Sequence, residues 1–196
     1  MADKALMTTL VACLAVNGAL ALPLATLILG RDISLAVAAI YYRYASLPAP
    51  KTLARYWDFS LPSAEVHPTT VSKLNTFLQL VLIGTTMCVA LLHDPAAPSS
   101  LTSIQSMLGG PEGVEKLVGG MGAVVAATTV YSGLSYVWLK DAVKILGDDE
   151  ALKRRQGRTG RMVIGGCFGG FIVAAAWLAW KEWERKGDEE EESGGK

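Results

Sequence analysis

Residues 43–76 read RYASLPAPKTLARYWDFSLPSAEVHPTTVSKLNT, the longest stretch of the chain that is too polar for a lipid core. It carries four cationic and two acidic side chains, and three prolines before Ser63 would interrupt a helix. On both sides the sequence becomes apolar for long runs, so this stretch separates two groups of membrane helices. Cations held between membrane segments suit the binding of anionic head groups. The stretch is therefore the first candidate for a functional site.

The composition of the whole chain is typical of a membrane protein. Of its 196 residues 51% are hydrophobic, and several apolar runs approach the roughly 20 residues that span a bilayer. The formal net charge is zero, with the acids concentrated in the C-terminal tail, which argues against a nucleic-acid binder. The three cysteines lie far apart in apolar runs, so we expect neither a disulfide framework nor a zinc site.

We predict an all-α, polytopic transmembrane bundle of about five apolar helices. Residues 5–29 are apolar throughout, and on hydropathy alone they would form one spanning helix. Asn17-Gly18 and then Pro23 favour a different interpretation, in which a short first helix ends in a tight turn and a second helix runs to about Tyr44. The first helix is then too short to cross a bilayer. Further apolar helices are expected over residues 77–92, 114–139 and 162–180.

The charge pattern suggests how the chain is divided and oriented. We expect one membrane domain over residues 1–145, a basic linker over 146–161, an additional transmembrane helix over 162–184 and a disordered acidic tail over 185–196. Loops 43–73 and 140–161 are both basic and are separated by two spans, so they should lie on the same face of the membrane. The positive-inside rule places that face toward the cytoplasm or the mitochondrial matrix.

Glycine pairs in the last apolar run offer a surface for close helix packing. Gly165-Gly166 and Gly169-Gly170 give two overlapping small-xxx-small spacings. Such spacings serve either packing within one chain or dimerisation, and the sequence leaves both open.

Arg31 and Asp32 form the most costly pair in the chain, because they fall inside the second predicted helix. An ionised arginine in hydrocarbon costs several kcal/mol unless it is paired or faces a wet cavity. One interpretation is a structural ion pair that locks two helices together. The other is that Arg31 grips a phosphate with its planar guanidinium while Asp32 orients it.

Three further cations are weaker candidates for an anion site. Lys73 lies at a predicted helix start, where backbone N–H groups attract anions, but a lysine that anchors a helix at the membrane surface explains it as well. Lys51 and Arg55 are four residues apart and could share a helical face, although ordinary surface charge explains them equally. Asp3, taken alone, is an N-cap residue.

The segments MADK at 1–4, GRD at 30–32 and the stretch 43–76 closely resemble the C-terminal half of eukaryotic CMP-forming cardiolipin synthases, in the CDP-alcohol phosphatidyltransferase superfamily. The resemblance covers about the first 92 residues and is most specific over 31–76. It implies a six-helix, usually dimeric bundle in the mitochondrial inner membrane that transfers a phosphatidyl group from CDP-diacylglycerol to phosphatidylglycerol and releases CMP. Phosphatidylglycerophosphate synthase, of the same superfamily, and a non-catalytic membrane scaffold protein are the alternatives.

The superfamily signature D-x-x-D-G-x-x-A-R…G-x-x-x-D-x-x-x-D supplies four aspartates, which hold two divalent cations, Mg²⁺ or Mn²⁺, against the CDP diphosphate. By resemblance Asp3 matches the last of them, a metal ligand and the proposed catalytic base, and its partner would fall before Met1. The resemblance also places four cations in the pocket for the acceptor's phosphate: Arg31, Lys51, Arg55 and Lys73. With the other aspartates absent from this chain, we expect residues 1–196 alone to be inactive.

Overall fold

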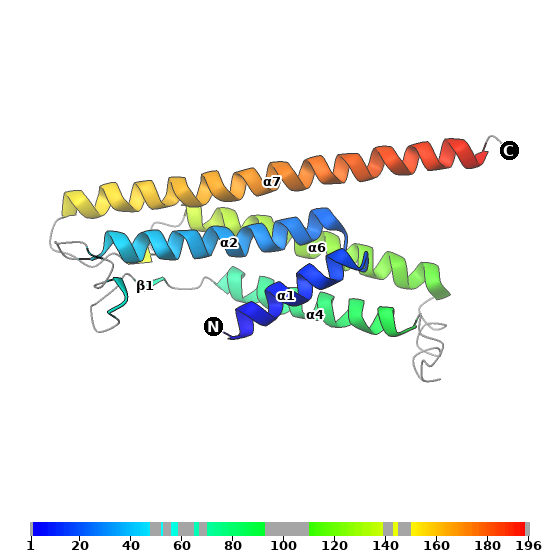
Figure 1. The fold of residues 1–196 in the computed structure, drawn as a ribbon, viewed down its shortest axis with the longest axis horizontal. Helices are drawn as coiled ribbons and strands as arrows, with labels where there is room; N and C mark the ends of the chain where they lie inside the picture. The colour runs from blue at the N-terminus through cyan, green and yellow to red at the C-terminus, as the bar shows by residue number, and fades with distance from the viewer. Residues whose placement is uncertain are drawn as a thin grey trace.

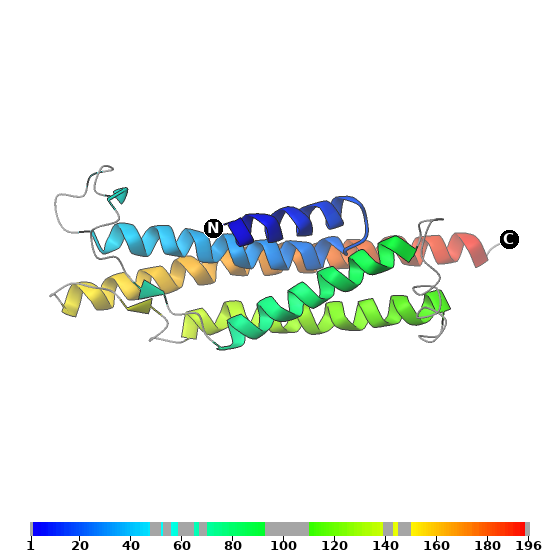
Figure 2. The ribbon, with the colours of Figure 1, turned by 90° about the horizontal axis from the view of Figure 1, so that it is seen from below.

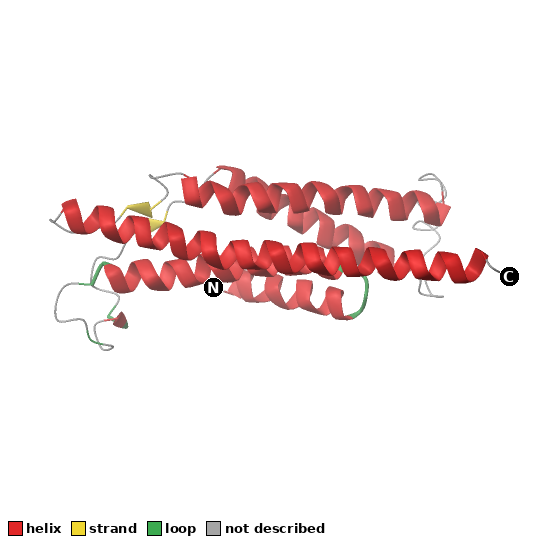
Figure 3. Cartoon of the chain, turned by 90° about the horizontal axis from the view of Figure 1, so that it is seen from above, coloured by secondary structure: helices red, strands yellow, loops and turns green. Residues whose placement is uncertain are grey.

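The structure is a computed structural model that describes residues 2–47, 52, 56–58, 65–66, 70–92, 110–138, 143–144 and 150–194. Helices make up nearly all of the described chain, which confirms the predicted all-α class (Figure 3). The helices of 15 residues or more within it are α1 (Ala2–Val16), α2 (Leu22–Ala45), α4 (Thr70–Leu92), α6 (Gly110–Trp138) and α7 (Glu150–Gly194). They lie roughly along one direction in an elongated bundle (Figure 1).

Four of these helices contain segments that are long and apolar enough to cross a membrane, by length and composition. The segments are Leu22–Ala45, Thr70–Leu91, Gly110–Trp138 and Arg155–Asp188. Helix α1 is shorter, as the sequence predicts, and lies against the bundle with the N-terminus part-way along it (Figure 2). The chain is therefore a helical membrane bundle.

The predicted break between the first two helices is confirmed. Gly18 has φ +71°, a left-handed conformation that glycine adopts without the steric cost of a side chain. The backbone N–H groups of Ala19 and Leu20 both donate to the carbonyl of Leu14, at 3.0 and 3.1 Å, so the turn satisfies the end of α1. Pro23 lies in the first turn of α2, where its missing N–H removes no helical hydrogen bond.

The main core lies where α1, the first half of α2, α4 and α6 meet. Leu82 of α4 is completely buried there, and Val11, Ile28 and Val125 are each at most 2% exposed. These residues come from all four helices, so burying their side chains is what brings α1 against the bundle. Outward-facing positions of the same helices carry exposed leucine, valine and phenylalanine, as expected where lipid is the solvent.

Helix α7 lies along α2 and packs on it through aromatic rings set against glycines (Figure 1). The ring of Phe171 occupies the space that a side chain at Gly30 would need, and the ring of Tyr42 does the same at Gly160. Each contact lets the two backbones come closer than a larger residue would allow.

The glycine pairs singled out in α7 take little part in this packing. The contact of α7 with α6 includes Phe168, whose ring lies on Gly133, and Gly165, which lies against Val137. A Cβ atom built on Gly166, Gly169 or Gly170 would meet nothing within 4 Å among the described residues. The sequence left open whether these glycines serve packing within one chain or dimerisation. Gly166, Gly169 and Gly170 do not serve close packing within the described part of this chain.

The structure differs from the sequence in where the last helix begins and ends. Helix α7 includes residues 150–161, expected to be a linker, and residues 185–194, expected to be a disordered tail. Residues 150–161 are rich in arginine and residues 185–194 in glutamate, both of high helix propensity, and neither segment contains a proline. Helix α7 thus extends beyond both ends of its apolar run.

The two basic loops meet at one end of the bundle. Strand β1 (Glu65–Val66) pairs antiparallel with β2 (Val143–Lys144), and Glu65 lies opposite Lys144 (Figure 3). This pairing joins a loop that follows α2 to one that follows α6, so the prediction that they share a face is confirmed. Which side of the membrane that face occupies stays a prediction.

Candidate functional site

Arg31 lies inside α2 and is buried between three helices. Its side chain is 8% exposed. One terminal nitrogen, Nη1, donates to Oδ1 of Asp32 at 2.7 Å. The other, Nη2, donates to the hydroxyl of Ser72 in α4 and lies 3.4 Å from the hydroxyl of Ser132 in α6. The guanidinium therefore ties α2 to both α4 and α6.

This geometry decides part of the question that the sequence left open about Arg31. Asp32 is the next residue of the same helix, so the ion pair itself locks no second helix, and the cross-links come from the two serines. Arg31 also retains unused hydrogen-bonding capacity. Its Nε is buried and has no partner within the described part of the chain. Because a guanidinium carries five N–H donors, Arg31 still has donors with which to bind an oxygen acceptor.

A second group of polar side chains lies between α4 and α6, one turn from the Arg31 contacts. Asn75 is completely buried, and its Oδ1 accepts hydrogen bonds from the hydroxyls of Thr128 at 2.9 Å and Thr129 at 3.0 Å. Gln79 donates from Nε2 to the Thr129 hydroxyl at 3.3 Å. Hydrogen bonds of this kind between membrane helices are worth roughly 0.6 kcal/mol on average. We call these four residues the α4–α6 seam.

We did not predict from the sequence that Ser72 and Ser132 contact Arg31, or that the seam forms, although α4 carried a signal. Residues 72, 75 and 79 of α4 are polar and are spaced by three and four, which places them on one face of an otherwise apolar helix. Polar residues in a membrane span usually face the interior of the bundle. Their spacing could thus have identified the face of α4 that meets α6.

Among the other candidate phosphate ligands, Lys73 is the one whose side chain the structure describes. Lys73 follows Ser72 in the first turn of α4, but its side chain is exposed, as a surface anchor would be. Lys51 and Arg55 lie outside the described residues, and so does the side chain of Asp3, whose backbone belongs to α1. Of the four candidate cations, the structure therefore describes Arg31 and Lys73. Of these two, Arg31 lies in a buried polar site and Lys73 does not.

Arg43 is a further cation whose role the sequence did not reveal. At the end of α2 its Nε donates to the carbonyl of Tyr56 at 2.9 Å, and its Nη2 donates to the carbonyl of Asp58 at 3.3 Å. Its guanidinium carbon also lies 5.3 Å from the centre of the Tyr56 ring, a cation–π distance. Arg43 therefore fixes the start of the basic loop against α2.

The metal site implied by the resemblance is not formed by the described residues. They include no group of three or more histidine, cysteine, aspartate or glutamate side chains placed to hold an ion. Two dications that each require about six oxygen ligands do not fit a single carboxylate such as Asp3. The Mg²⁺ or Mn²⁺ of the superfamily would need ligands from outside this set.

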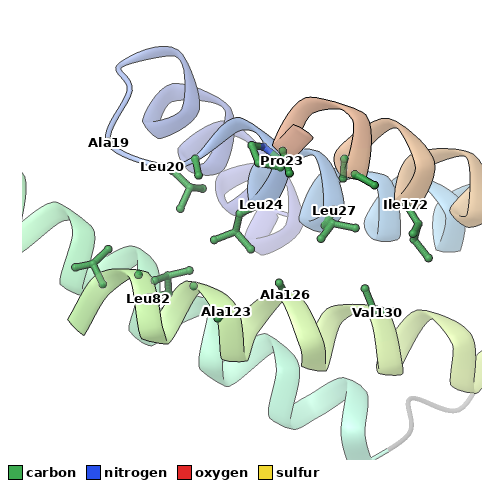
Figure 4. A pocket seen from close by; sticks show the side chains of 17 residues that line it. Ala19, Leu20, Pro23, Leu24, Leu27, Leu82, Ala123, Ala126, Val130 and Ile172 are labelled. Atoms are coloured by element: carbon green, nitrogen blue, oxygen red, sulfur yellow. The ribbon is translucent and has the colours of Figure 1, made fainter. Parts of the chain in front are cut away.

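An apolar cavity of about 460 Å³ lies between α2, α6 and α7, in the half of the bundle away from the basic loops (Figure 4). Leu24 and Leu27 face it from α2, Ala126 and Val130 from α6, and Ile172 from α7. Every residue that lines it is apolar or glycine, so this cavity does not suit a phosphate.

Known proteins similar to the chain carry the name of one enzyme. A Schizosaccharomyces pombe protein named cardiolipin synthase (CMP-forming) / mitochondrial hydrolase fusion protein is 41% identical over 147 residues, which cover 75% of this chain and 22% of that protein. The Homo sapiens cardiolipin synthase (CMP-forming) is 36% identical over 93 residues, which cover 47% of this chain and 31% of that protein. The chain is a homologue of the cardiolipin synthases.

A Drosophila melanogaster protein named probable cardiolipin synthase (CMP-forming) agrees, at 44% identity over 84 residues, which cover 43% of this chain and 26% of that protein. The chain thus spans about a fifth to a third of the length of these relatives. No protein-family model and no solved structure matches it. The resemblance to cardiolipin synthases is confirmed, and these names do not favour phosphatidylglycerophosphate synthase or a scaffold protein.

Proposed function

We propose that this cardiolipin synthase homologue supplies the acceptor-binding part of a CDP-alcohol phosphatidyltransferase. The whole enzyme would transfer a phosphatidyl group from CDP-diacylglycerol to phosphatidylglycerol and release CMP, in the mitochondrial inner membrane. The observation that carries the proposal is Arg31, a buried guanidinium in contact with side chains of α2, α4 and α6, whose Nε has no partner among the described residues. The names of the relatives and the four apolar helices support a lipid substrate.

The surroundings of Arg31 suit a lipid phosphodiester. Ser72 and Ser132 hold Nη2 in a set orientation, so the group is positioned before any ligand arrives. The side chain of Asp32 is 33% exposed, which marks the side from which the pair can be reached. A phosphate arriving there would replace the Asp32 carboxylate on Nη1 and form a charge-assisted pair with a planar donor. Lys73, exposed one turn into α4, would add attraction at longer range.

Transfer itself needs groups that the described residues do not assemble. In the superfamily two divalent cations bind the diphosphate of the donor, and Asp3 would contribute one ligand. Because the described residues do not fit two metals, we assign them acceptor binding and membrane packing only. The metal ligands and the donor site then belong to the rest of the enzyme.

A homodimer forms part of the same proposal, and the open face of α7 supports it. Gly166, Gly170, Val173 and Trp177 follow one another at spacings of four, three and four, so they share a face, and all four are exposed. Two of them are glycines in a small-xxx-small spacing, the arrangement that lets two membrane helices approach closely. A second copy of α7 is the partner that this face fits.

The acceptor proposal is tested by binding, which needs no catalysis. Residues 1–196 in detergent are titrated with dihexanoyl phosphatidylglycerol by calorimetry. Arg31→Ala should weaken binding about tenfold or more, because a hydrogen bond to a charged group contributes about 1.5–3 kcal/mol. Arg31→Lys should recover only part of the loss, because a point charge replaces a two-pronged donor.

The control for this titration is Lys116→Ala, in an exposed ion pair with Glu112 on α6. This variant should bind as the unaltered chain does, because exposed pairs contribute little. Thermal unfolding shows whether each variant is folded. Unchanged affinity in folded Arg31→Ala would overturn the assignment, and loss of folded protein in both Arg31 variants would make the residue a structural one.

A further inference from the structure

Three of the four residues of the α4–α6 seam are buried, and the seam lies next to the groups that hold Arg31. Asn75 and Thr129 are both completely buried, and their hydrogen bond of 3.0 Å crosses between the two helices. Ser72 precedes Asn75 by three residues in α4, and Ser132 follows Thr129 by three in α6. One helical turn therefore separates the seam from each serine that contacts Nη2 of Arg31.

This arrangement makes the distance between the two serines depend on the seam. A single nitrogen of Arg31 contacts both hydroxyls, so α4 and α6 must stay at a separation that lets both reach it. Apolar contacts are non-directional and tolerate sliding of one helix along the other. The Asn75–Thr129 and Gln79–Thr129 hydrogen bonds are directional and fix the two helices in register.

We propose that Asn75 and Thr129 are positioning residues for Arg31, and thereby set the affinity of the site for a phosphodiester that neither of them touches. The inference rests on the proposed role of Arg31 in acceptor binding. In this proposal the seam keeps the guanidinium in its binding orientation before the ligand arrives. A mobile Arg31 would have to be ordered at the moment of binding, which lowers affinity.

The variants that test the proposal keep shape and remove hydrogen bonds. Thr129→Val and Asn75→Leu break the seam from opposite helices, while Thr129→Ser keeps the hydroxyl and should retain affinity. Thr86→Val is the matched control, because Thr86 is also buried in α4 but donates only to the carbonyl of Leu82 in its own helix. Each variant of residues 1–196 is titrated with dihexanoyl phosphatidylglycerol, and with inorganic phosphate to learn whether the anion alone suffices.

Thr129→Val and Asn75→Leu should each weaken binding about three- to tenfold, the range typical of coupled neighbours, while Thr86→Val and Thr129→Ser leave it unchanged. The decisive measurement is a double-mutant cycle with Arg31→Ala. If the seam acts through Arg31, Thr129→Val should weaken binding no further in that background.

The possible results separate this proposal from the one on which it rests. If Arg31→Ala weakens binding but Thr129→Val behaves as Thr86→Val does, the seam plays no positioning part while the acceptor site stands. If Arg31→Ala has no effect, both proposals fail together. An effect of Thr129→Val that persists without Arg31 overturns the positioning role. Loss of folded protein in both Thr129→Val and Asn75→Leu also overturns it, because it assigns the seam to stability alone.

Discussion

Single residues decide how closely the helices of this bundle approach one another, and Gly30 is the sharpest case. A Cβ at this position would fall on the Cγ and Cβ atoms of Phe171 in α7. The position of the Phe171 Cβ atom is fixed by the backbone of α7, so a change of rotamer cannot remove that clash. Because Gly30 precedes Arg31 in α2, the same contact also sets how α7 covers the helix that carries the candidate site.

We predict that Gly30→Ala destabilises the chain although alanine is the better helix former. Overpacking in a close contact costs roughly 1–3 kcal/mol, more than the approximately 1 kcal/mol that alanine contributes to a helix. Thermal unfolding in detergent should show a lower midpoint for Gly30→Ala. The midpoint should not fall for Gly84→Ala, whose added Cβ meets nothing within 4 Å. Combining Gly30→Ala with Phe171→Gly, which removes both contacting atoms, should relieve the clash. Equal midpoints for the two glycine variants would contradict this packing.

Arg31 shows what the sequence could and could not reveal about a residue. Its cost inside an apolar run identified it as important without any structure. Its partners could not be predicted, because the polar spacing in α4 indicates which face of that helix turns inward but not which residue that face contacts. The Arg31–Asp32 pair was visible in the sequence, but the helices that Arg31 joins through Ser72 and Ser132 depend on how α4 and α6 fold back onto α2.

Among the helices, α7 shows that hydropathy identifies an apolar span but does not predict where its helix begins and ends. The apolar run identified its middle, whereas its ends at Glu150 and Gly194 lie in charged sequence. A helix end is recognised from a proline or a cap, and no proline lies between these residues. The turn between α1 and α2 was predicted correctly for the complementary reason, since Gly18 and Pro23 mark it directly.

We predict that one exposed face of α7 forms the dimer contact, the face that carries Gly166, Gly170, Val173 and Trp177. Gly166→Leu combined with Gly170→Leu should abolish a dimer of residues 1–196 in detergent, measured as molar mass by light scattering after gel filtration. Two leucines hold the helices apart and remove the close contact on which such pairs depend. Gly120→Leu in α6 is the control, because Gly120 is also exposed and has open space around it. A dimer that survives the double substitution would place the interface elsewhere.

Across the whole molecule, the basic loops and the apolar cavity lie in different halves of the bundle. The basic loops meet at one end through β1 and β2, while the apolar cavity near Leu24 and Ile172 lies in the other half (Figures 1 and 4). The sequence predicted the shared end of the loops from charge and from the number of spans between them. It gave no hint of the cavity, because that space depends on how α2, α6 and α7 diverge after they have packed.

The acidic side chains of the described residues bear on whether residues 1–196 could catalyse phosphatidyl transfer alone. Phosphatidyl transfer in the superfamily depends on two metals, and two metals depend on carboxylates that converge from neighbouring helices. Asp3 is the carboxylate that the resemblance assigns to this role, and the described residues bring no cluster of further ligands together. Asp32, the acid inside α2, is already bound to Arg31. Water would outcompete a single carboxylate for ions that each need about six oxygens.

We therefore predict no release of CMP when residues 1–196 are supplied with CDP-diacylglycerol, phosphatidylglycerol and Mg²⁺ or Mn²⁺. A protein in which a segment with the D-x-x-D-G-x-x-A-R signature precedes these residues should show metal-dependent release, because the signature supplies further aspartate ligands. Within that active protein, Asp3→Asn should abolish turnover by removing both a ligand and the proposed base. Glu112→Gln should not, because Glu112 is an exposed acid at the start of α6. Metal-dependent CMP release by residues 1–196 alone would show that the catalytic centre lies within this chain, among groups other than those assigned to it.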